Sequence, residues 1–188
     1  WPQVPIALGK IRNPFLIFVA RKLESMAYKK ADHIIALSPG MCDGIVSMGI
    51  SPKKITMVPN GCDNFTAVTK VKSVKRQTPF FEPTKFNVVY AGTHGFANNL
   101  KQVLQAAEII QNKGYHKVTF HFFGIGEEKE LLINYASKKL LNNTLFHEPK
   151  AKEDLFPILA QADVGLQVLR NQKEFYEGTS PNKFFDYM

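Results

Sequence analysis

The segment Glu177–Met188 holds the residues of this 188-residue chain whose types and spacing are best suited to chemistry. Gly178, Thr179 and Ser180 precede Pro181, an order that predicts a tight turn followed by the start of a helix. The first backbone N–H groups of a helix lack partners within the helix and attract negative charge. The segment is therefore a candidate site for a diphosphate.

Charged side chains in this segment could complete such a site. Lys183 could neutralise a diphosphate, and Asp186, one turn further on, could accept hydrogen bonds from ribose hydroxyls. Glu177 lies just before the turn and Asn182 lies in the first turn of the predicted helix. The same pattern also suits ordinary helix initiation, so the segment by itself allows both interpretations.

A second candidate is the glycine-rich segment Gly92, Thr93, His94 and Gly95, with Asn98 close behind it. It follows a predicted strand and precedes a predicted helix, so its backbone N–H groups could approach a ligand closely, and His94 could donate to a phosphate or a sugar hydroxyl. It is not a P-loop, because it lacks Gly-Lys-Ser/Thr at the required spacing. An ordinary strand-to-helix turn explains it equally well.

Two further segments follow predicted strands. His147 and Glu148 end a short strand, where the loop could contact the edge of a nucleotide base. No His/Cys cluster accompanies them, so the spacing predicts no metal site. Gly124–Glu128 resembles the start of a dinucleotide fingerprint, but it lacks the third glycine, and its two glutamates disfavour phosphate. A structural turn is the better interpretation there.

These segments need a scaffold, and from residue 86 onward the sequence predicts one. Apolar runs typical of buried strands alternate with amphipathic helices. We predict strands at 86–91, 118–124, 144–147 and 164–169 and helices at 97–113, 127–141 and 152–162. This alternation predicts an α/β fold with a Rossmann-like parallel sheet, in which ligands bind beyond the carboxyl ends of the strands.

The sequence pattern of the N-terminal part predicts a smaller portion of a similar fold. Asn13 and Pro14 are typical of a helix start, and the helix they open extends to about residue 30. Apolar runs at 33–37 and 55–58 predict two buried strands, with a short helix between them. Basic residues and prolines replace the periodicity between 63 and 85. We therefore predict an N-terminal domain over 1–62, a linker over 63–85 and a second domain over 86–188.

Composition narrows the class of partner and the compartment. A formal net charge of +8 and a pI of about 9.4 favour anionic partners such as a nucleotide, a nucleic acid or an acidic membrane. The two cysteines suggest thiols in a reducing compartment, and with no visible signal peptide we expect a cytoplasmic protein. The basic flanks of the helix near residues 14–30 allow a peripheral contact with the inner face of the plasma membrane, although packing on a sheet is the more usual role.

Four ordered segments, residues 31–38, 54–63, 90–98 and 180–188, resemble glycosyltransferase family 4. The chain looks most similar to the branch that builds bacterial O-antigen and capsule repeat units, including N-acetyl-fucosamine transferases. The resemblance implies a GT-B fold with two Rossmann-like domains. It also implies a retaining, metal-independent transfer from a nucleotide sugar, held mainly by the second domain, to a glycan or lipid-linked acceptor held mainly by the first.

Family roles carry over to some positions. Asp186 matches the second acid of the Glu-x7-Glu motif, which holds the ribose, whereas the first acid falls on Gly178, with Glu177 one residue early. The basic pair that many members use on the diphosphate falls on Thr93 and Asn98. The resemblance therefore implies that other groups contact the diphosphate, namely Lys183, His94 and backbone amides.

The resemblance further implies a UDP-linked donor, no cofactor and no metal. The catalytic residues are expected outside this chain, which is similar to the end of an acceptor domain joined to most of a donor domain. A nucleotide-sugar 2-epimerase with the same fold remains an alternative, as does a non-catalytic binding module. Nucleic-acid binding is disfavoured, because the positive charge concentrates in the predicted linker and the sequence shows no aromatic and basic sheet motif.

Overall fold

The computed structural model describes residues 2–61, 79–172, 174–175 and 181–187, which fall into two compact units. The first unit contains the described residues of Trp1–Gly61 and Asn171–Asn182, and the second contains those of Cys62–Arg170 and Lys183–Met188. Most of the predicted linker, residues 63–78, lies outside the described residues. The division into 1–62, 63–85 and 86–188 therefore stays a prediction.

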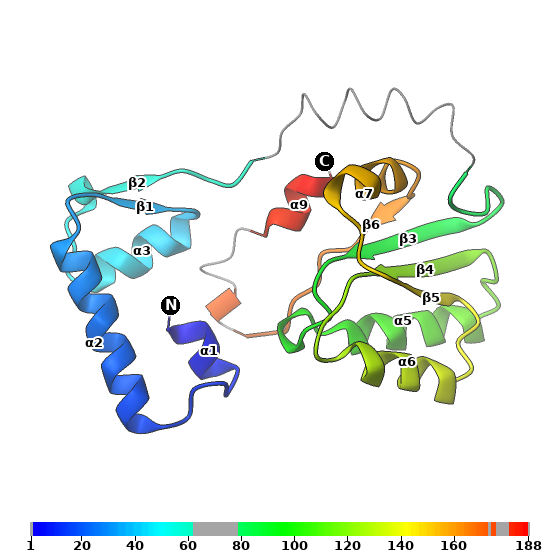
Figure 1. The fold of residues 1–188 in the computed structure, drawn as a ribbon, viewed down its shortest axis with the longest axis horizontal. Coiled ribbons are helices and arrows are strands. Elements are labelled where there is room, and N and C mark those ends of the chain that lie inside the picture. Colours follow the sequence, from blue (N-terminus) through cyan, green and yellow to red (C-terminus); the bar gives the residue numbers. More distant parts are fainter. Residues whose placement is uncertain (1, 62–78, 173, 176–180, 188) are drawn as a thin grey trace. The chain divides into compact units, whose positions relative to one another are not determined.

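The first unit is a short parallel sheet with helices before and between its strands (Figure 1). Its elements are α1 (Gln3–Ala7), α2 (Pro14–Lys30), β1 (Ile34–Ala36), α3 (Pro39–Ser47), a 3-10 turn (Pro52–Lys54) and β2 (Ile55–Met57). The two strands pair in parallel, with Ile34 opposite Ile55. Ile34, Ala36, Ile45 and Ile50 form a small core between the sheet and α3. Both predicted strands are present, each slightly shorter than expected.

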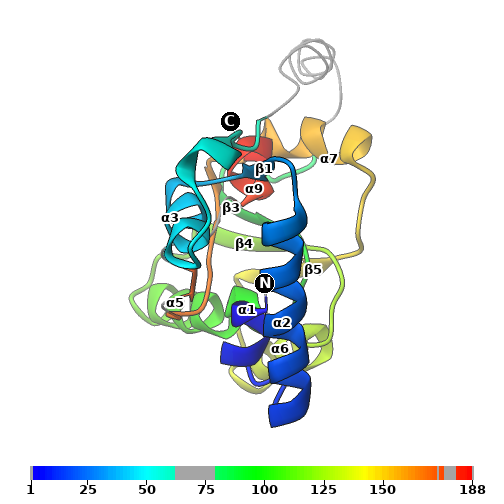
Figure 2. The same ribbon diagram turned by 90° about the vertical axis from the view of Figure 1, so that its left-hand side faces the viewer.

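Helix α2 begins where the sequence predicts. The Asn13 side chain accepts a hydrogen bond from the Phe15 N–H at 2.9 Å, and Pro14 occupies the first helical position. Glu24, in the second half of the helix, is buried, and Gln3 of α1 donates to it at 3.2 Å. Figure 2 shows α1 beside α2. No helix in the described part of the chain is long and apolar enough to cross a membrane.

The second unit is a four-stranded parallel sheet in the order β5-β4-β3-β6. Its elements are β3 (Phe86–Ala91), a 3-10 turn (Phe96–Asn98), α5 (Leu100–Asn112), β4 (Val118–Phe123), α6 (Lys129–Lys138), β5 (Thr144–His147), α7 (Lys152–Leu159), β6 (Val164–Gly165) and α9 (Asn182–Tyr187). This arrangement confirms the predicted α/β class with a Rossmann-like parallel sheet.

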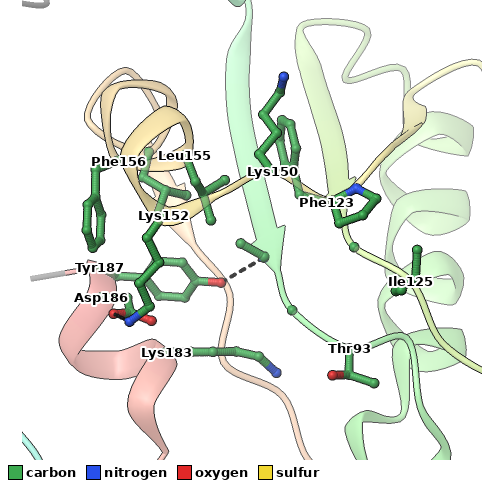
Figure 3. A pocket seen from close by; sticks show the side chains of 15 residues that line it. Thr93, Phe123, Ile125, Lys150, Lys152, Leu155, Phe156, Lys183, Asp186 and Tyr187 are labelled. Atoms are coloured by element: carbon green, nitrogen blue, oxygen red, sulfur yellow. Dashed lines mark hydrogen bonds and ion pairs between the residues drawn. The ribbon is translucent and has the colours of Figure 1, made fainter.

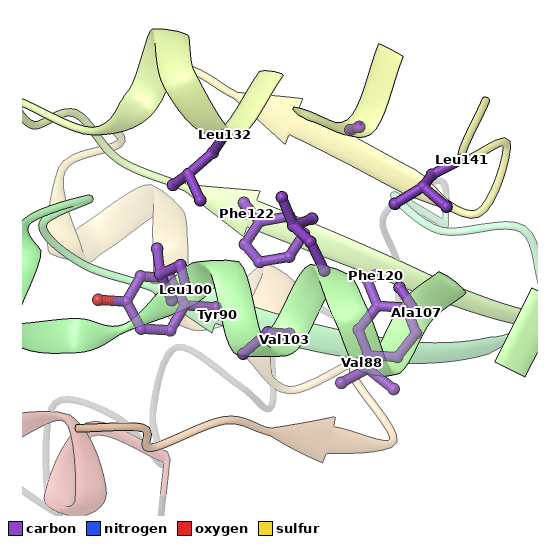
Figure 4. Packing of buried hydrophobic residues seen from close by; sticks show 11 residues of the cluster. Val88, Tyr90, Leu100, Val103, Ala107, Phe120, Phe122, Leu132 and Leu141 are labelled. Atoms are coloured by element: carbon purple, nitrogen blue, oxygen red, sulfur yellow. The ribbon is translucent and has the colours of Figure 1, made fainter. Parts of the chain in front are cut away.

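Helices cover both faces of this sheet, with α5 and α6 on one face and α7 and α9 on the other (Figure 1). The central strands β3 and β4 are buried on both faces, which explains their continuous apolar runs. The face beneath α5 and α6 carries the larger core, in which aromatic rings of β3 and β4 pack against aliphatic side chains of the helices (Figure 4). The opposite core contains Phe81, Val89, Ala91, Phe123 and Ile158.

Strand β6 is shorter than the predicted 164–169, because a side chain takes the next hydrogen-bonding position on β3. Leu166 N–H still donates to the Val89 carbonyl at 2.7 Å. In a regular parallel ladder, the next hydrogen bond would run from the Ala91 N–H to a backbone carbonyl of an extended β6. That N–H donates instead to the Tyr187 hydroxyl at 2.9 Å. The ladder therefore ends, and α9 is anchored to β3 at that point.

The predicted helix at 97–113 begins later than expected, at Leu100. Phe96–Asn98 forms a single 3-10 turn, and Asn99 follows with a φ of 48°, in the left-handed region that asparagine tolerates. This turn matters for the site, because it brings Asn98 back toward the end of β3.

Candidate functional site

A pocket of about 370 Å³ lies at the carboxyl edge of the second unit's sheet (Figure 3). The ends of β3 and β4 form one side of it, and α7 and α9 form the other. Its volume falls within the range of small-molecule sites. The pocket therefore occupies the edge at which parallel sheets of this kind bind ligands.

Two glycines allow the strand ends to approach one another here. Gly92 has a φ of +149°, and a Cβ there would collide with the Lys183 side chain. Gly124 has a φ of +137°, and a Cβ there would collide with the Gly92 carbonyl. The glycine after each strand is thus required by the local backbone and by the close packing. Gly124 serves a structural turn, as the sequence indicates.

Lys183 projects from α9 into this edge of the sheet. Its ammonium donates to the Tyr90 hydroxyl at 2.8 Å and to Asn98 Oδ1 at 3.0 Å, and it lies 4.5 Å from the centre of the Tyr90 ring. Burial lowers the pKa of Lys183 to about 8. None of the carboxylates in the described part of the chain forms an ion pair with it.

Asp186 lines the same pocket, but its charge already has a partner. Its Oδ1 lies 2.8 Å from the Lys152 ammonium of α7 (Figure 3). Lys150 lines the pocket as well. The described lining therefore has three lysines and one paired aspartate, a balance that favours an anionic ligand.

Tyr187, Lys150 and Lys152 belong to the pocket but were not predicted. Tyr187 lies four residues after Lys183, on the same side of α9, and burial raises its pKa to about 12. The two lysines follow the strand β5 and lie at its carboxyl end. Their place after a predicted strand was a usable signal, whereas Tyr187 carried no signal beyond its helical spacing.

His94 lies in the core. Its side chain is fully buried among Tyr90, Phe122 and Phe146, and neither ring nitrogen makes a hydrogen bond. Burial lowers its pKa to about 4, with smaller contributions from the charges of Lys129 and Lys183. The Phe123 carbonyl opposes this shift, although its geometry falls short of a hydrogen bond. The ring is therefore neutral at pH 7, and it is not among the pocket-lining residues.

His147 and Glu148 lie beside the pocket, which Pro149 and Lys150 line instead. The His147 ring stacks on Phe123 at 4.3 Å, and burial lowers its pKa. The exposed Glu148 carboxylate pairs with Lys129 at 2.8 Å.

Of the other predicted site residues, some line the pocket, some are described but do not line it, and some lie outside the described residues. Thr93 lines the pocket, Gly95 precedes the 3-10 turn, and Asn182 begins α9 with an exposed side chain. Glu177, Gly178, Thr179 and Ser180 lie outside the described residues. Of the predicted set, the structure brings Gly92, Thr93, Asn98, Lys183 and Asp186 together. Within the described ranges, no group of three His, Cys, Asp or Glu side chains is arranged to hold a metal.

Residues 7–64 match the family model described as Glycosyltransferase Family 4. No curated protein sequence matches the chain.

Similar solved structures include those of TarM, HepE and WaaG. TarM of S. aureus, in complex with fondaparinux, alpha-GlcNAc-glycerol and UDP, is 16% identical with a TM-score of 0.58, and the match covers 77% of this chain and 27% of TarM. HepE of Anabaena with UDP-glucose is 17% identical with a TM-score of 0.60, over 76% of this chain and 40% of HepE.

WaaG, a glycosyltransferase involved in lipopolysaccharide biosynthesis, is 12% identical with a TM-score of 0.59, over 73% of this chain and 38% of WaaG. The chain thus spans less than half the length of each of these structures. The resemblance to glycosyltransferase family 4 is confirmed over residues 7–64, and the fold of the chain is that of the GT-B glycosyltransferases.

Proposed function

We propose that this chain belongs to a glycosyltransferase whose second unit binds the diphosphate of a nucleotide sugar at Lys183. The observation that carries the proposal is a half-buried ammonium with neutral partners, in a pocket at the carboxyl edge of a parallel sheet. Burying a cation is unfavourable unless an opposite charge or hydrogen bonds compensate it. A diphosphate would supply the missing negative charge, with Lys150 and Lys152 contributing from α7 and the loop before it.

We propose UDP as the nucleotide of the donor. TarM and HepE, which share the fold, were crystallised with UDP or UDP-glucose. We assign the ribose to Asp186 by its match to the family's second acid. Its ion pair with Lys152 would then have to rearrange or share the carboxylate, whose second oxygen forms no hydrogen bond with the described residues and could accept one from a hydroxyl.

Calorimetric titration of the chain with UDP, GDP and ADP tests this proposal. We expect UDP to bind most tightly, and Lys183→Met to weaken it by roughly tenfold to a hundredfold, because a charge-assisted hydrogen bond contributes about 1.5 to 3 kcal/mol. Lys113→Met is the matched control, since Lys113 is exposed and follows α5 at the opposite edge of the sheet. Equal UDP affinity of Lys183→Met and the unsubstituted chain would refute the assignment.

The proposed reaction is a retaining, metal-independent transfer to a glycan or lipid-linked acceptor in the synthesis of a cell-surface polysaccharide, carried out in the cytoplasm. WaaG, with its role in lipopolysaccharide biosynthesis, supports this class of acceptor through its fold. The test uses the longest protein that contains this chain, with UDP-sugars as donors and excess chelator present. NMR of the product should show the anomeric configuration of the donor, and an inverted product would contradict the retaining assignment.

A further inference from the structure

We infer that Tyr90 and Asn98 are positioning residues that hold the Lys183 ammonium at the pocket wall with one N–H left for an anion. The inference deepens the proposed function and rests on it for the identity of that anion as a nucleotide diphosphate. Neither residue need touch the ligand, because each acts through Lys183.

The three side chains converge from distant parts of the second unit. Tyr90 is near the end of β3, Asn98 ends the 3-10 turn that follows, and Lys183 comes from α9. The ammonium donates to Tyr90 Oη at 2.8 Å and to Asn98 Oδ1 at 3.0 Å. The stem of Lys183 passes over Gly92, where a Cβ would collide with it. Both the stem and the tip of the side chain are therefore fixed by β3 and the segment after it.

The Thr93 carbonyl determines which way the two partners face. It accepts a hydrogen bond from the Tyr90 hydroxyl at 2.8 Å and another from Asn98 Nδ2 at 2.8 Å. Because the single hydroxyl proton is used there, the oxygen of Tyr90 presents lone pairs to Lys183. Because the amide nitrogen of Asn98 is used there, its oxygen must face Lys183. One backbone carbonyl thus orients two acceptors toward one cation.

The donor count leaves a place for a ligand. An ammonium group has three N–H donors, and the contacts within the described residues use two of them. Lys183 also lines the pocket, so the third donor is available to a phosphate oxygen there. The two neutral partners hold the cation without cancelling its charge, which a carboxylate in their place would do.

This arrangement predicts how anion binding responds to pH. The titratable and charged groups that contact Lys183, interact with its charge or share its pocket are Tyr90, His94, Lys150, Lys152, Asp186 and Tyr187, from β3, the loop after it, the loop before α7, α7 and α9. Burial raises the pKa values of both tyrosines far above neutrality, and it lowers the pKa of His94 to about 4. The pKa of Lys183 is about 8. UDP affinity should therefore fall as the pH rises through about 8, because Lys183 loses its charge there.

Substitutions of the two partners should move this midpoint in opposite directions. Tyr90→Phe keeps the ring but removes an acceptor from the charged form, so we expect UDP to bind several-fold more weakly at pH 7 and the midpoint to fall by up to about one pH unit. Asn98→Asp adds a negative charge beside the ammonium, so the midpoint should rise. Lys183→Met should remove the part of the pH dependence that comes from Lys183. Any dependence that remains reports the titration of UDP itself.

Tyr135→Phe is the matched control. Its hydroxyl donates to Glu108 at 3.0 Å between α6 and α5, and neither residue lines the pocket, so its removal should leave both affinity and midpoint unchanged. A loss of folding in Tyr90→Phe would show as a lower melting temperature and as equal weakening at every pH. Unchanged midpoints in folded Tyr90→Phe and Asn98→Asp would overturn the inference.

A second measurement does not depend on the nucleotide. The 13Cε chemical shift of Lys183, assigned by its loss in Lys183→Met, reports the titration of the ammonium in the free chain. We expect a midpoint near 8 in the unsubstituted chain and a lower one in Tyr90→Phe. If UDP fails to bind, the proposed function is refuted. The positioning role is tested separately, because it is refuted only if the Lys183 midpoint is the same in Tyr90→Phe and in the unsubstituted chain.

Discussion

At the scale of single residues, the site depends on the position of one cation, Lys183, and on the lack of negative charge on its two hydrogen-bond acceptors. Lys183 is half-buried beside a tyrosine hydroxyl and an amide oxygen, and both acceptors are neutral. The cation thus keeps its charge available for a ligand. Gly92 makes this possible, because it has no side chain where the lysine stem passes.

Gly92→Ala should therefore act on binding through Lys183. The new methyl group would displace the lysine stem, and the φ of +149° would be strained for alanine. We expect UDP affinity in calorimetry to fall about tenfold, a loss comparable to one hydrogen bond to a charged group. Gly44→Ala in α3 is the control, since a Cβ there meets nothing within 4 Å. Wild-type affinity in a folded Gly92→Ala chain would show that the lysine position is not critical.

At the scale of elements, α9 is held to β3 by the side chains of Lys183 and Tyr187, which form hydrogen bonds to Tyr90 and Ala91. The Tyr187 hydroxyl accepts from the Ala91 N–H at 2.9 Å, and its ring packs on the core beneath α7. This contact ends the β3–β6 ladder and sets where Lys183 enters the pocket. The position of the cation is thus coupled to the length of β6.

Tyr187→Phe tests whether the Tyr187 hydroxyl anchors α9 and ends the β3–β6 ladder. It leaves a buried N–H without its acceptor, which costs about 1 to 3 kcal/mol in the free energy of unfolding. We expect a lower denaturation midpoint, weaker UDP binding and faster amide exchange at Ala91. Tyr115→Phe, at an exposed position, should change none of these. Retained protection at Ala91 would mean that β6 has lengthened to replace the hydroxyl, and Tyr187 would then not determine where the ladder ends.

At the scale of the whole molecule, each unit has its own small core, and the core of the second unit buries two uncharged histidines. His94 and His121 are buried, and burial lowers the pKa of each to about 4. The unfolded chain would bind a proton at each of them near pH 6.5, whereas the folded chain would not. Stability should therefore fall as the pH drops from about 6.5 to about 4 and should level off for these groups below that.

Thermal unfolding between pH 7 and pH 4 tests this dependence. A depression of this size corresponds to about 3 kcal/mol for each histidine at the acid end. His94→Leu should make the unfolding free energy of the second unit less sensitive to pH. His116→Leu, on the exposed loop before β4, should leave the sensitivity unchanged. An equal pH dependence in His94→Leu and the unsubstituted chain would show that His94 is protonated without cost.

Much of the fold was predictable because it depends on local periodicity. The apolar runs at 86–91, 118–123 and 144–147 became β3, β4 and β5, and Asn13 capped α2 as its type and place indicate. The end of β6 was not predictable, because it depends on a tyrosine that lies more than twenty residues away in the sequence. Local sequence reports which face of an element is apolar, but not which distant side chain competes for its hydrogen bonds.

The sequence by itself determined the α/β class, the strand order along the chain and the place of Gly92, Lys183 and Asp186 at the carboxyl edge of the parallel sheet. Only the tertiary structure decided what these residues do to one another. It placed His94 in the core, paired Asp186 with Lys152, and joined Lys183 to Asn98 across 85 positions of sequence. The reason is physical: periodicity is a property of neighbours along the chain, whereas charge pairing and burial depend on contacts that only folding creates.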